Sequence, residues 1–132
     1  MDISGLVEKV AGSVVAVVTR PFEAFPGDFG FGTAFAIDTK FFATAYHVVA
    51  SAGEVALVTP EGEKAEGRVV AADPAEDVAL IYSELRAPPL RLGSALRLKV
   101  GQGVVAIGYP LALLDKPTAT FGKRSGHNTE GR

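Results

Sequence analysis

The segment GFGTAFAIDTKFFATAYHVV, residues 30–49, decides the fold that we predict for this chain. Over residues 29–38, aromatic or aliphatic side chains alternate with glycine and small residues, which is typical of a β-strand. A turn near residues 38–40 leads into a second apolar run, FFATA at residues 41–45. Two such runs joined by a short polar turn predict a β-hairpin. A short helical turn is expected to follow at residues 47–53.

Short strand patterns continue on both sides of this hairpin. The β-branched run at residues 13–19 predicts a buried strand, and an apolar stripe at residues 2–10 predicts a short helix with Asp2 as its N-cap. Gly67 is expected to mark a bulge or bend. Many short strands with almost no helix predict an all-β barrel or sandwich. The further strands are expected at residues 54–59, 64–73, 77–82, 100–110 and 117–122, with an extended segment at residues 87–93.

The composition is that of a globular protein and excludes several functional classes. Of the 132 residues, 48% are hydrophobic and 21% are charged, which argues against a disordered chain. Thirteen Lys and Arg against fifteen Asp and Glu give a net charge of −2, so the chain lacks the basic signature of a nucleic-acid-binding protein. The chain has no cysteine, which excludes disulfide scaffolds, thiolate metal sites and cysteine nucleophiles.

No apolar run approaches the roughly 20 residues that a membrane-spanning helix needs. The N-terminus also lacks the features of a signal peptide, because Asp2 and Glu8 stand where a basic region belongs. The compartment therefore stays open between a cytoplasmic protein and an exported protein whose leader has been removed.

His47 and Asp77 are the polar side chains that stand out, 30 residues apart and each where an apolar strand meets a loop. A carboxylate that accepts a hydrogen bond from the imidazole Nδ1–H fixes the tautomer and leaves Nε2 free to take a proton from a nucleophile. The alternative interpretations are a structural histidine, and an aspartate that only caps a turn. A third is a metal site formed by His47, Asp77 and His127.

Three ordered segments resemble trypsin-like serine proteases of the HtrA/Deg type. In that family, a Gly-Ser/Thr-Gly-Phe strand and a hairpin precede Thr-x-x-His-Val-Val, as in residues 30–49 here, although Ala34 replaces the usual glycine. Residues 67–81, GRVVAADPAEDVALI, resemble the segment of the catalytic aspartate. Residues 88–110 resemble the linker and first strand of the second barrel. The matching residues are Gly32, Thr33, Phe35, Thr44, His47, Val48, Val49, Asp73, Pro74, Asp77, Ala79, Leu80, Leu92, Gly93, Val100, Gly101, Ala106, Ile107, Gly108 and Pro110.

This resemblance implies a domain organisation and a chemistry. A short helix in residues 1–12 is expected to precede a six-stranded antiparallel β-barrel in residues 13–93. Residues 94–132 would form a linker and the opening strands of an incomplete second barrel. The resemblance assigns His47 as general base and Asp77 as its orienter in the hydrolysis of peptide bonds, with protein or peptide substrates and no cofactor or metal.

The family's nucleophile motif, Gly-Asn/Asp-Ser-Gly-Gly, does not occur in this sequence. Beyond Asp77 the only serines are Ser83, Ser94 and Ser125. Ser125 lies in GKRSGH, which echoes the motif but comes too early and lacks its second glycine, so it is a weak candidate nucleophile. Without the nucleophile turn the chain would also lack the oxyanion hole.

Two interpretations follow from this departure. In the first, the chain is the N-terminal part of a protease and is inactive alone. In the second, it is a complete small β-barrel of protease ancestry that serves in binding or assembly. In both, the strands beyond residue 100 would expose unpaired edges, so self-association is expected.

Overall fold

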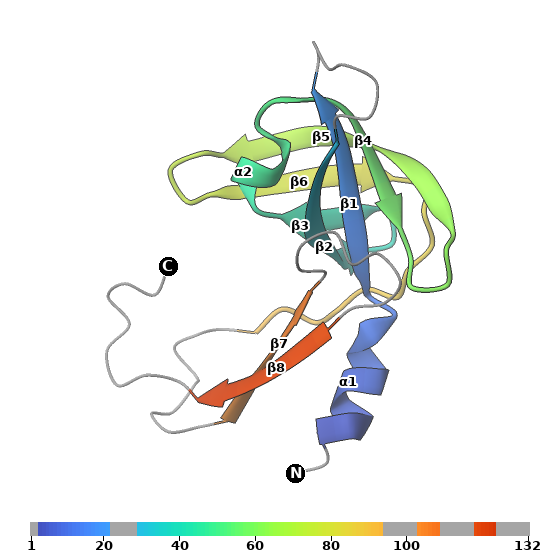
Figure 1. Ribbon diagram of the computed structural model, residues 1–132, viewed down its shortest axis with the longest axis vertical. Coiled ribbons are helices and arrows are strands. Elements are labelled where there is room, and N and C mark those ends of the chain that lie inside the picture. Colours follow the sequence, from blue (N-terminus) through green and yellow to red (C-terminus); the bar gives the residue numbers. More distant parts are fainter. Residues whose placement is uncertain (1–2, 22–28, 94–102, 109–117, 124–132) are drawn as a thin grey trace.

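The computed structural model describes residues 3–21, 29–93, 103–108 and 118–123 (Figure 1). It contains two helices and eight strands among these residues. They are α1 (Ile3–Ala11), β1 (Val14–Pro21), β2 (Gly30–Asp38), β3 (Phe41–Thr44), α2 (Tyr46–Val49), β4 (Ala52–Val58), β5 (Lys64–Asp73), β6 (Val78–Ser83), β7 (Gly103–Gly108) and β8 (Thr118–Lys123).

The first six strands close into a barrel in the order β1-β2-β3-β6-β5-β4, and every neighbouring pair is antiparallel. This confirms the predicted six-stranded antiparallel barrel. Strands β7 and β8 pair with each other in a separate two-stranded sheet (Figure 1). That β7 and β8 open a second barrel stays a prediction, because the segments around them lie outside the described residues.

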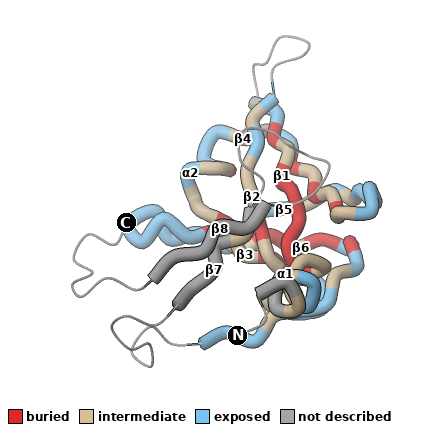
Figure 2. Tube along the Cα trace, turned by 60° about the horizontal axis from the view of Figure 1, so that its bottom comes forward, coloured by how far each residue is buried: buried red, intermediate tan, exposed pale blue. Residues whose placement is uncertain are grey.

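Buried residues alternate with more exposed ones along β2, β3 and β6, whereas residues 14–17 of β1 are all buried (Figure 2). Small side chains at Ala34 and Ala36 of β2 leave room for Phe42, the largest of the fully buried side chains. On the outer side of β1, Ile107 of β7 packs with the buried Val14 and Ala16. The members of the main core cluster are Val15, Val17, Ala34, Ala36, Phe42, Val49, Val55, Leu57, Ala79, Ile81 and Leu85.

Two local predictions from the sequence are wrong. The helical turn ends at Val49 instead of residue 53, because residues from Ala52 onward pair with β1. Gly67 is not the site of a bulge: it pairs in register with Val55 and Ser83, and the irregularity lies between Val69 and Ala71.

Gly67 is required by packing instead. A Cβ atom at this position would lie 2.7 Å from Cγ2 of Ile81, which is fully buried. Because carbon atoms pack at about 3.5–4.0 Å, a larger residue here would force the core to shift.

We therefore expect Gly67→Ala to lower the free energy of unfolding by about 1–3 kcal/mol, the usual cost of overpacking a core. Urea denaturation would measure the change. Gly93→Ala is the matched control, because a Cβ atom there would have no neighbour within 4 Å. Equal unfolding free energies for the two variants would contradict this account of Gly67.

Candidate active site

His47 lies at the end of the β2–β3 hairpin, in the first turn of α2. The hydroxyl of Thr44, the last residue of β3, donates a hydrogen bond to the carbonyl oxygen of Thr33 on β2 at 2.7 Å. Ala45 then adopts an extended conformation with φ −76° and ψ 139° and cannot cap the helix with its side chain. The helix that carries His47 therefore begins without a local cap.

Asp77 is the last residue of the turn between β5 and β6. Its backbone N–H donates to the carbonyl oxygen of Pro74 at 3.2 Å. Its φ of 57° is in the left-handed region, which Asp and Asn tolerate better than most other residues. This conformation places Asp77 against the start of α2.

Three contacts join Asp77 to α2. Its Oδ2 atom lies 2.8 Å from Nδ1 of His47, and its Oδ1 atom accepts a hydrogen bond from the backbone N–H of His47 at 2.8 Å. Its carbonyl oxygen accepts from the backbone N–H of Tyr46 at 3.1 Å. Asp77 thus supplies from 30 residues away the cap that Ala45 lacks, and holds the imidazole ring with the same carboxylate.

These contacts favour the ionised form of Asp77. The hydrogen bond from the His47 ring, followed by that from its backbone N–H, holds the pKa of Asp77 below its usual value. An ionised carboxylate at Nδ1 fixes the proton of a neutral imidazole on that nitrogen and leaves Nε2 as an acceptor. The side chain of His47 is 74% exposed, so the ring is open to an approaching group.

The lowered pKa of Asp77 predicts an acid dependence of stability. Its contribution is complete above the unfolded-state pKa of about 3.9 and disappears as pH falls through the lower folded-state pKa. We expect urea unfolding across this acidic range to show a shallower pH dependence for Asp77→Asn than for the wild type. Glu61→Gln, in the exposed turn between β4 and β5, is the control, and an Asp77→Asn curve parallel to the wild type would contradict the prediction.

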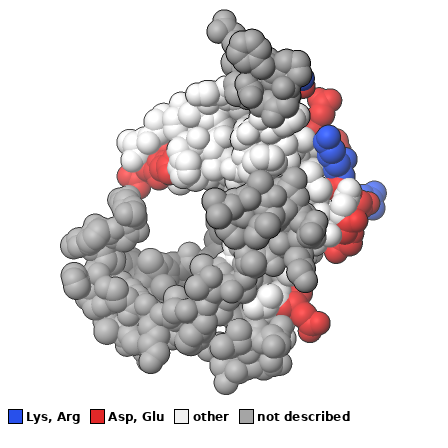
Figure 3. All heavy atoms as spheres, viewed as in Figure 1, with Lys and Arg blue, Asp and Glu red and all other residues white. Residues whose placement is uncertain are grey.

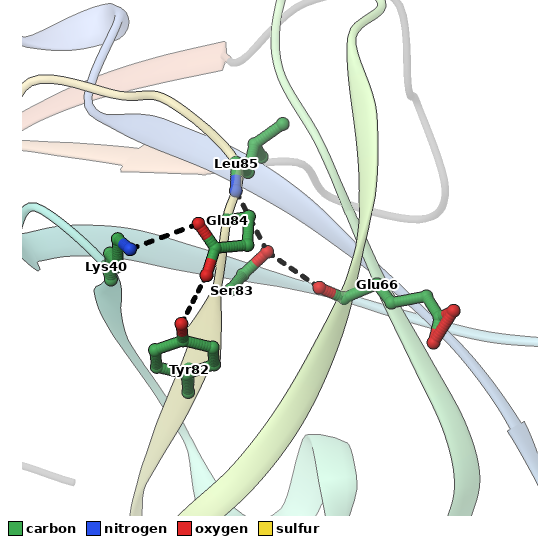
Figure 4. Close-up of polar contacts among 6 residues, drawn as sticks. All are labelled: Lys40, Glu66, Tyr82, Ser83, Glu84 and Leu85. Atoms are coloured by element: carbon green, nitrogen blue, oxygen red, sulfur yellow. Dashed lines mark hydrogen bonds and ion pairs between the residues drawn. The ribbon is translucent and has the colours of Figure 1, made fainter.

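Ser83, the one candidate serine among the described residues, does not lie beside this pair. Ser83 is fully buried at the far end of β6, where its hydroxyl donates to the carbonyl oxygen of Glu66 at 2.7 Å and accepts from the N–H of Leu85 at 3.2 Å (Figure 4). Both hydrogen bonds of this hydroxyl are therefore made with backbone groups. Ser94 and Ser125 lie outside the described residues.

The metal hypothesis receives no support from the part of the chain that the structure describes, where no group of three His, Asp or Glu side chains could hold an ion. His127 lies outside this part, so its combination with His47 and Asp77 stays untested.

Neither described helix is long and apolar enough to cross a membrane.

A second polar cluster, which the sequence did not reveal, lies away from the pair. Glu84 accepts a hydrogen bond from the Tyr82 hydroxyl and forms an ion pair with Lys40 at 3.2 Å (Figure 4). These two contacts lower the pKa of Glu84. Lys40 and Glu84 line an open pocket of about 530 Å³ together with Thr39, Arg86, Ala87 and Pro88.

On the face seen in Figure 3, the visible Lys and Arg lie along the right edge beside Asp and Glu, so the described residues visible there form no basic patch. This distribution agrees with the weak net charge of −2.

Known proteins with similar sequences and structures point to one family. The family described as "Trypsin-like peptidase domain" matches residues 32–132. A "Probable periplasmic serine endoprotease DegP-like" of Ectopseudomonas mendocina is 39% identical over 83 residues, which cover 62% of this chain and 18% of that protein. The "Serine protease HTRA2, mitochondrial" of Bos taurus is 32% identical over 123 residues, which cover 89% of this chain and 27% of that protein.

Solved structures of the same type share the fold. The structure titled "HtrA-type protease AlgW with tripeptide" has a TM-score of 0.84 at 25% identity and covers 97% of this chain and 42% of its own. This chain therefore spans well under half the length of the proteins that it matches. The family match extends over most of the chain and agrees with the barrel and with the sequence relatives. The chain belongs to the trypsin-like peptidase family and is of its HtrA type.

Proposed function

We propose that this chain supplies the base half of the active site of an HtrA-type serine endopeptidase. His47 is the general base and acid, and Asp77 orients it. The observation that carries the proposal is the double hydrogen bond in which both carboxylate oxygens of Asp77 hold His47, one at the ring and one at the backbone, each at 2.8 Å.

The chemistry follows from this geometry. When a serine oxygen attacks the carbonyl carbon of a peptide bond, the serine proton passes to Nε2 of His47. The ionised Asp77 stabilises the imidazolium cation that forms. As the C–N bond breaks, His47 returns the proton to the leaving amine, and an acyl-enzyme remains for hydrolysis by water.

We assign the role of nucleophile to no residue of 1–132. The printed sequence contains no Gly-x-Ser-Gly-Gly motif, so we propose that these residues alone do not hydrolyse peptide bonds. The 74% exposure of the His47 side chain fits a ring that receives its serine from another structural element.

The test is a cleavage assay of the purified chain with casein and a set of fluorogenic peptides. We expect no hydrolysis above that of the His47→Ala and Ser125→Ala variants. Hydrolysis by the wild type that disappears in both variants would contradict the proposal, because it would identify Ser125 as a nucleophile activated by His47.

One observation favours the second candidate function, a module for assembly. Among the described strands, β7 and β8 pair only with each other, so each leaves one edge without a strand partner. Such edges are templates for pairing with another chain.

We therefore propose self-association through β7 and β8, and expect analytical ultracentrifugation to show a concentration-dependent dimer or larger species. Replacing Val104 by proline in one variant and Val105 in a second covers both N–H directions of β7. The variant whose lost N–H faces the open edge should shift the chain towards the monomer, because proline cannot donate a hydrogen bond to a neighbouring strand. A wild-type chain that stays monomeric across the concentration range would contradict the proposal.

A further inference from the structure

Three contacts hold α2 at the end of the barrel. Asp77 binds its N-terminus, as described above, and Val49 is 5% exposed within the main core cluster. The third contact is made by Val48, which packs against that cluster from its edge and lies directly over Gly32 of β2.

Gly32 belongs to a row of small residues on the inner face of β2. It shares the alternation of Ala34 and Ala36, both of which are fully buried, and it pairs with the fully buried Val17 of β1. The side chains of this row are smallest at Gly32, where α2 crosses the end of the barrel.

The space above Gly32 is fully occupied by Val48. A Cβ atom built on Gly32 would lie 2.5 Å and 2.8 Å from the two γ-carbons of Val48, and 3.2 Å from its Cβ atom. Rotation of the Val48 side chain cannot relieve this overlap, because two of its three staggered positions lie too close to the added atom and its two γ-carbons always fill at least one of them. The contact therefore fixes the position of the helix backbone and not only that of one side chain.

We propose that Gly32 and Val48 are positioning residues for the general base. Their contact fixes the position of α2 on the barrel, and thereby the distance between His47 and Asp77. This inference rests on the proposed role of His47 in catalysis. Its structural part, the control of the His47–Asp77 hydrogen bond, can be tested without any hydrolysis.

The size of the expected effect follows from the distances. Since carbon atoms pack at about 3.5–4.0 Å, an alanine at position 32 must displace Val48, and with it α2, by about 1 Å. A displacement of about 1 Å is enough to break a hydrogen bond, because the interaction is lost when the two heavy atoms are about 3.6 Å apart.

The experiment reads the tautomer of His47 by long-range ¹H–¹⁵N NMR. The background variant His127→Gln leaves His47 as the single histidine. In this background we expect the proton of the neutral ring on Nδ1. Gly32→Ala should lose that preference and move the ring towards the Nε2–H form, to the same extent as Asp77→Asn does.

A compensating change separates positioning from general destabilisation. Val48→Ala alone removes both γ-carbons and should weaken the Nδ1–H preference by loosening α2. In Gly32→Ala/Val48→Ala, the added methyl group occupies the space that Val48 has left, and the preference should return. Gly93→Ala is the control and should leave the spectrum unchanged, since a Cβ atom there has open space.

Two results would overturn the inference. One is a folded Gly32→Ala variant with the wild-type tautomer. The other is a Gly32→Ala/Val48→Ala variant in which the Nδ1–H preference of His47 is no stronger than in Val48→Ala. If Gly32→Ala does not fold, the comparison of Val48→Ala with the double variant decides the question. If the tautomer responds as expected while His47 proves dispensable for hydrolysis in the two-barrel protein described in the Discussion, the positioning contact stands and the proposed catalytic role does not.

Discussion

Replacing Phe42 by alanine should lower the free energy of unfolding by about 3–5 kcal/mol, the usual cost of removing a buried phenylalanine. Phe42 is fully buried in β3, where it lies between Ala36 on β2 and Ile81 on β6. Both neighbours belong to the same core cluster, so the cavity left by the ring has little freedom to collapse. A domain of ordinary stability has about 5–15 kcal/mol to lose, so this single change should bring the barrel close to unfolding.

Urea denaturation followed by circular dichroism measures this loss. Phe29→Ala is the matched control, because Phe29 is 52% exposed and its replacement should change the unfolding free energy by only about 0.5 kcal/mol or less. Similar midpoints for the two variants would show that Phe42 does not anchor the core.

The second large effect concerns Asp77 in an active protein. Joining residues 1–93 to the nucleophile-bearing second barrel of an HtrA-type protease should give a two-barrel protein that cleaves peptides. In this protein we expect Asp77→Asn to reduce kcat by about 10⁴-fold. Asparagine keeps an oxygen for the backbone N–H of His47, but it presents an NH₂ donor to Nδ1. The ring then carries its proton on Nε2 and cannot accept one from serine.

Asp73→Asn is the control for this experiment. Asp73 lies in the same hairpin, and its carboxylate accepts a hydrogen bond from the backbone N–H of Glu76 at 3.2 Å, a bond that asparagine can retain. We expect wild-type activity for Asp73→Asn. A kcat for Asp77→Asn within a few-fold of the wild type would contradict the orienting role of Asp77.

The barrel could be predicted from the sequence because its strands are marked locally. The alternation at residues 29–38 and the apolar run after the turn at residues 38–40 indicate β2, β3 and their hairpin before any tertiary contact is known. The positions of His47 and Asp77 at strand ends marked them as candidates, and the resemblance to the family assigned them to one site. The structure places Nδ1 of His47 2.8 Å from Oδ2 of Asp77.

What the sequence could not reveal depends on contacts between distant residues. The sequence pattern around Gly67 is that of a bulge, whereas its real constraint is the methyl group of Ile81 on the next strand. In the same way, nothing near Ala45 indicates how α2 is capped, because the cap comes from Asp77. Local patterns do not encode such pairings, which form only once the barrel has closed.

The most direct test of the central claim is the effect of His47→Ala on peptide cleavage by the two-barrel protein. If His47 is the general base, kcat/KM should fall to the level reached when the nucleophilic serine of the added barrel is replaced by alanine. The combination of both changes should then reduce it no further, because the two groups act as one unit. Cleavage by the His47→Ala variant at a rate near that of the unmodified two-barrel protein would contradict the claim that this chain contributes the catalytic base.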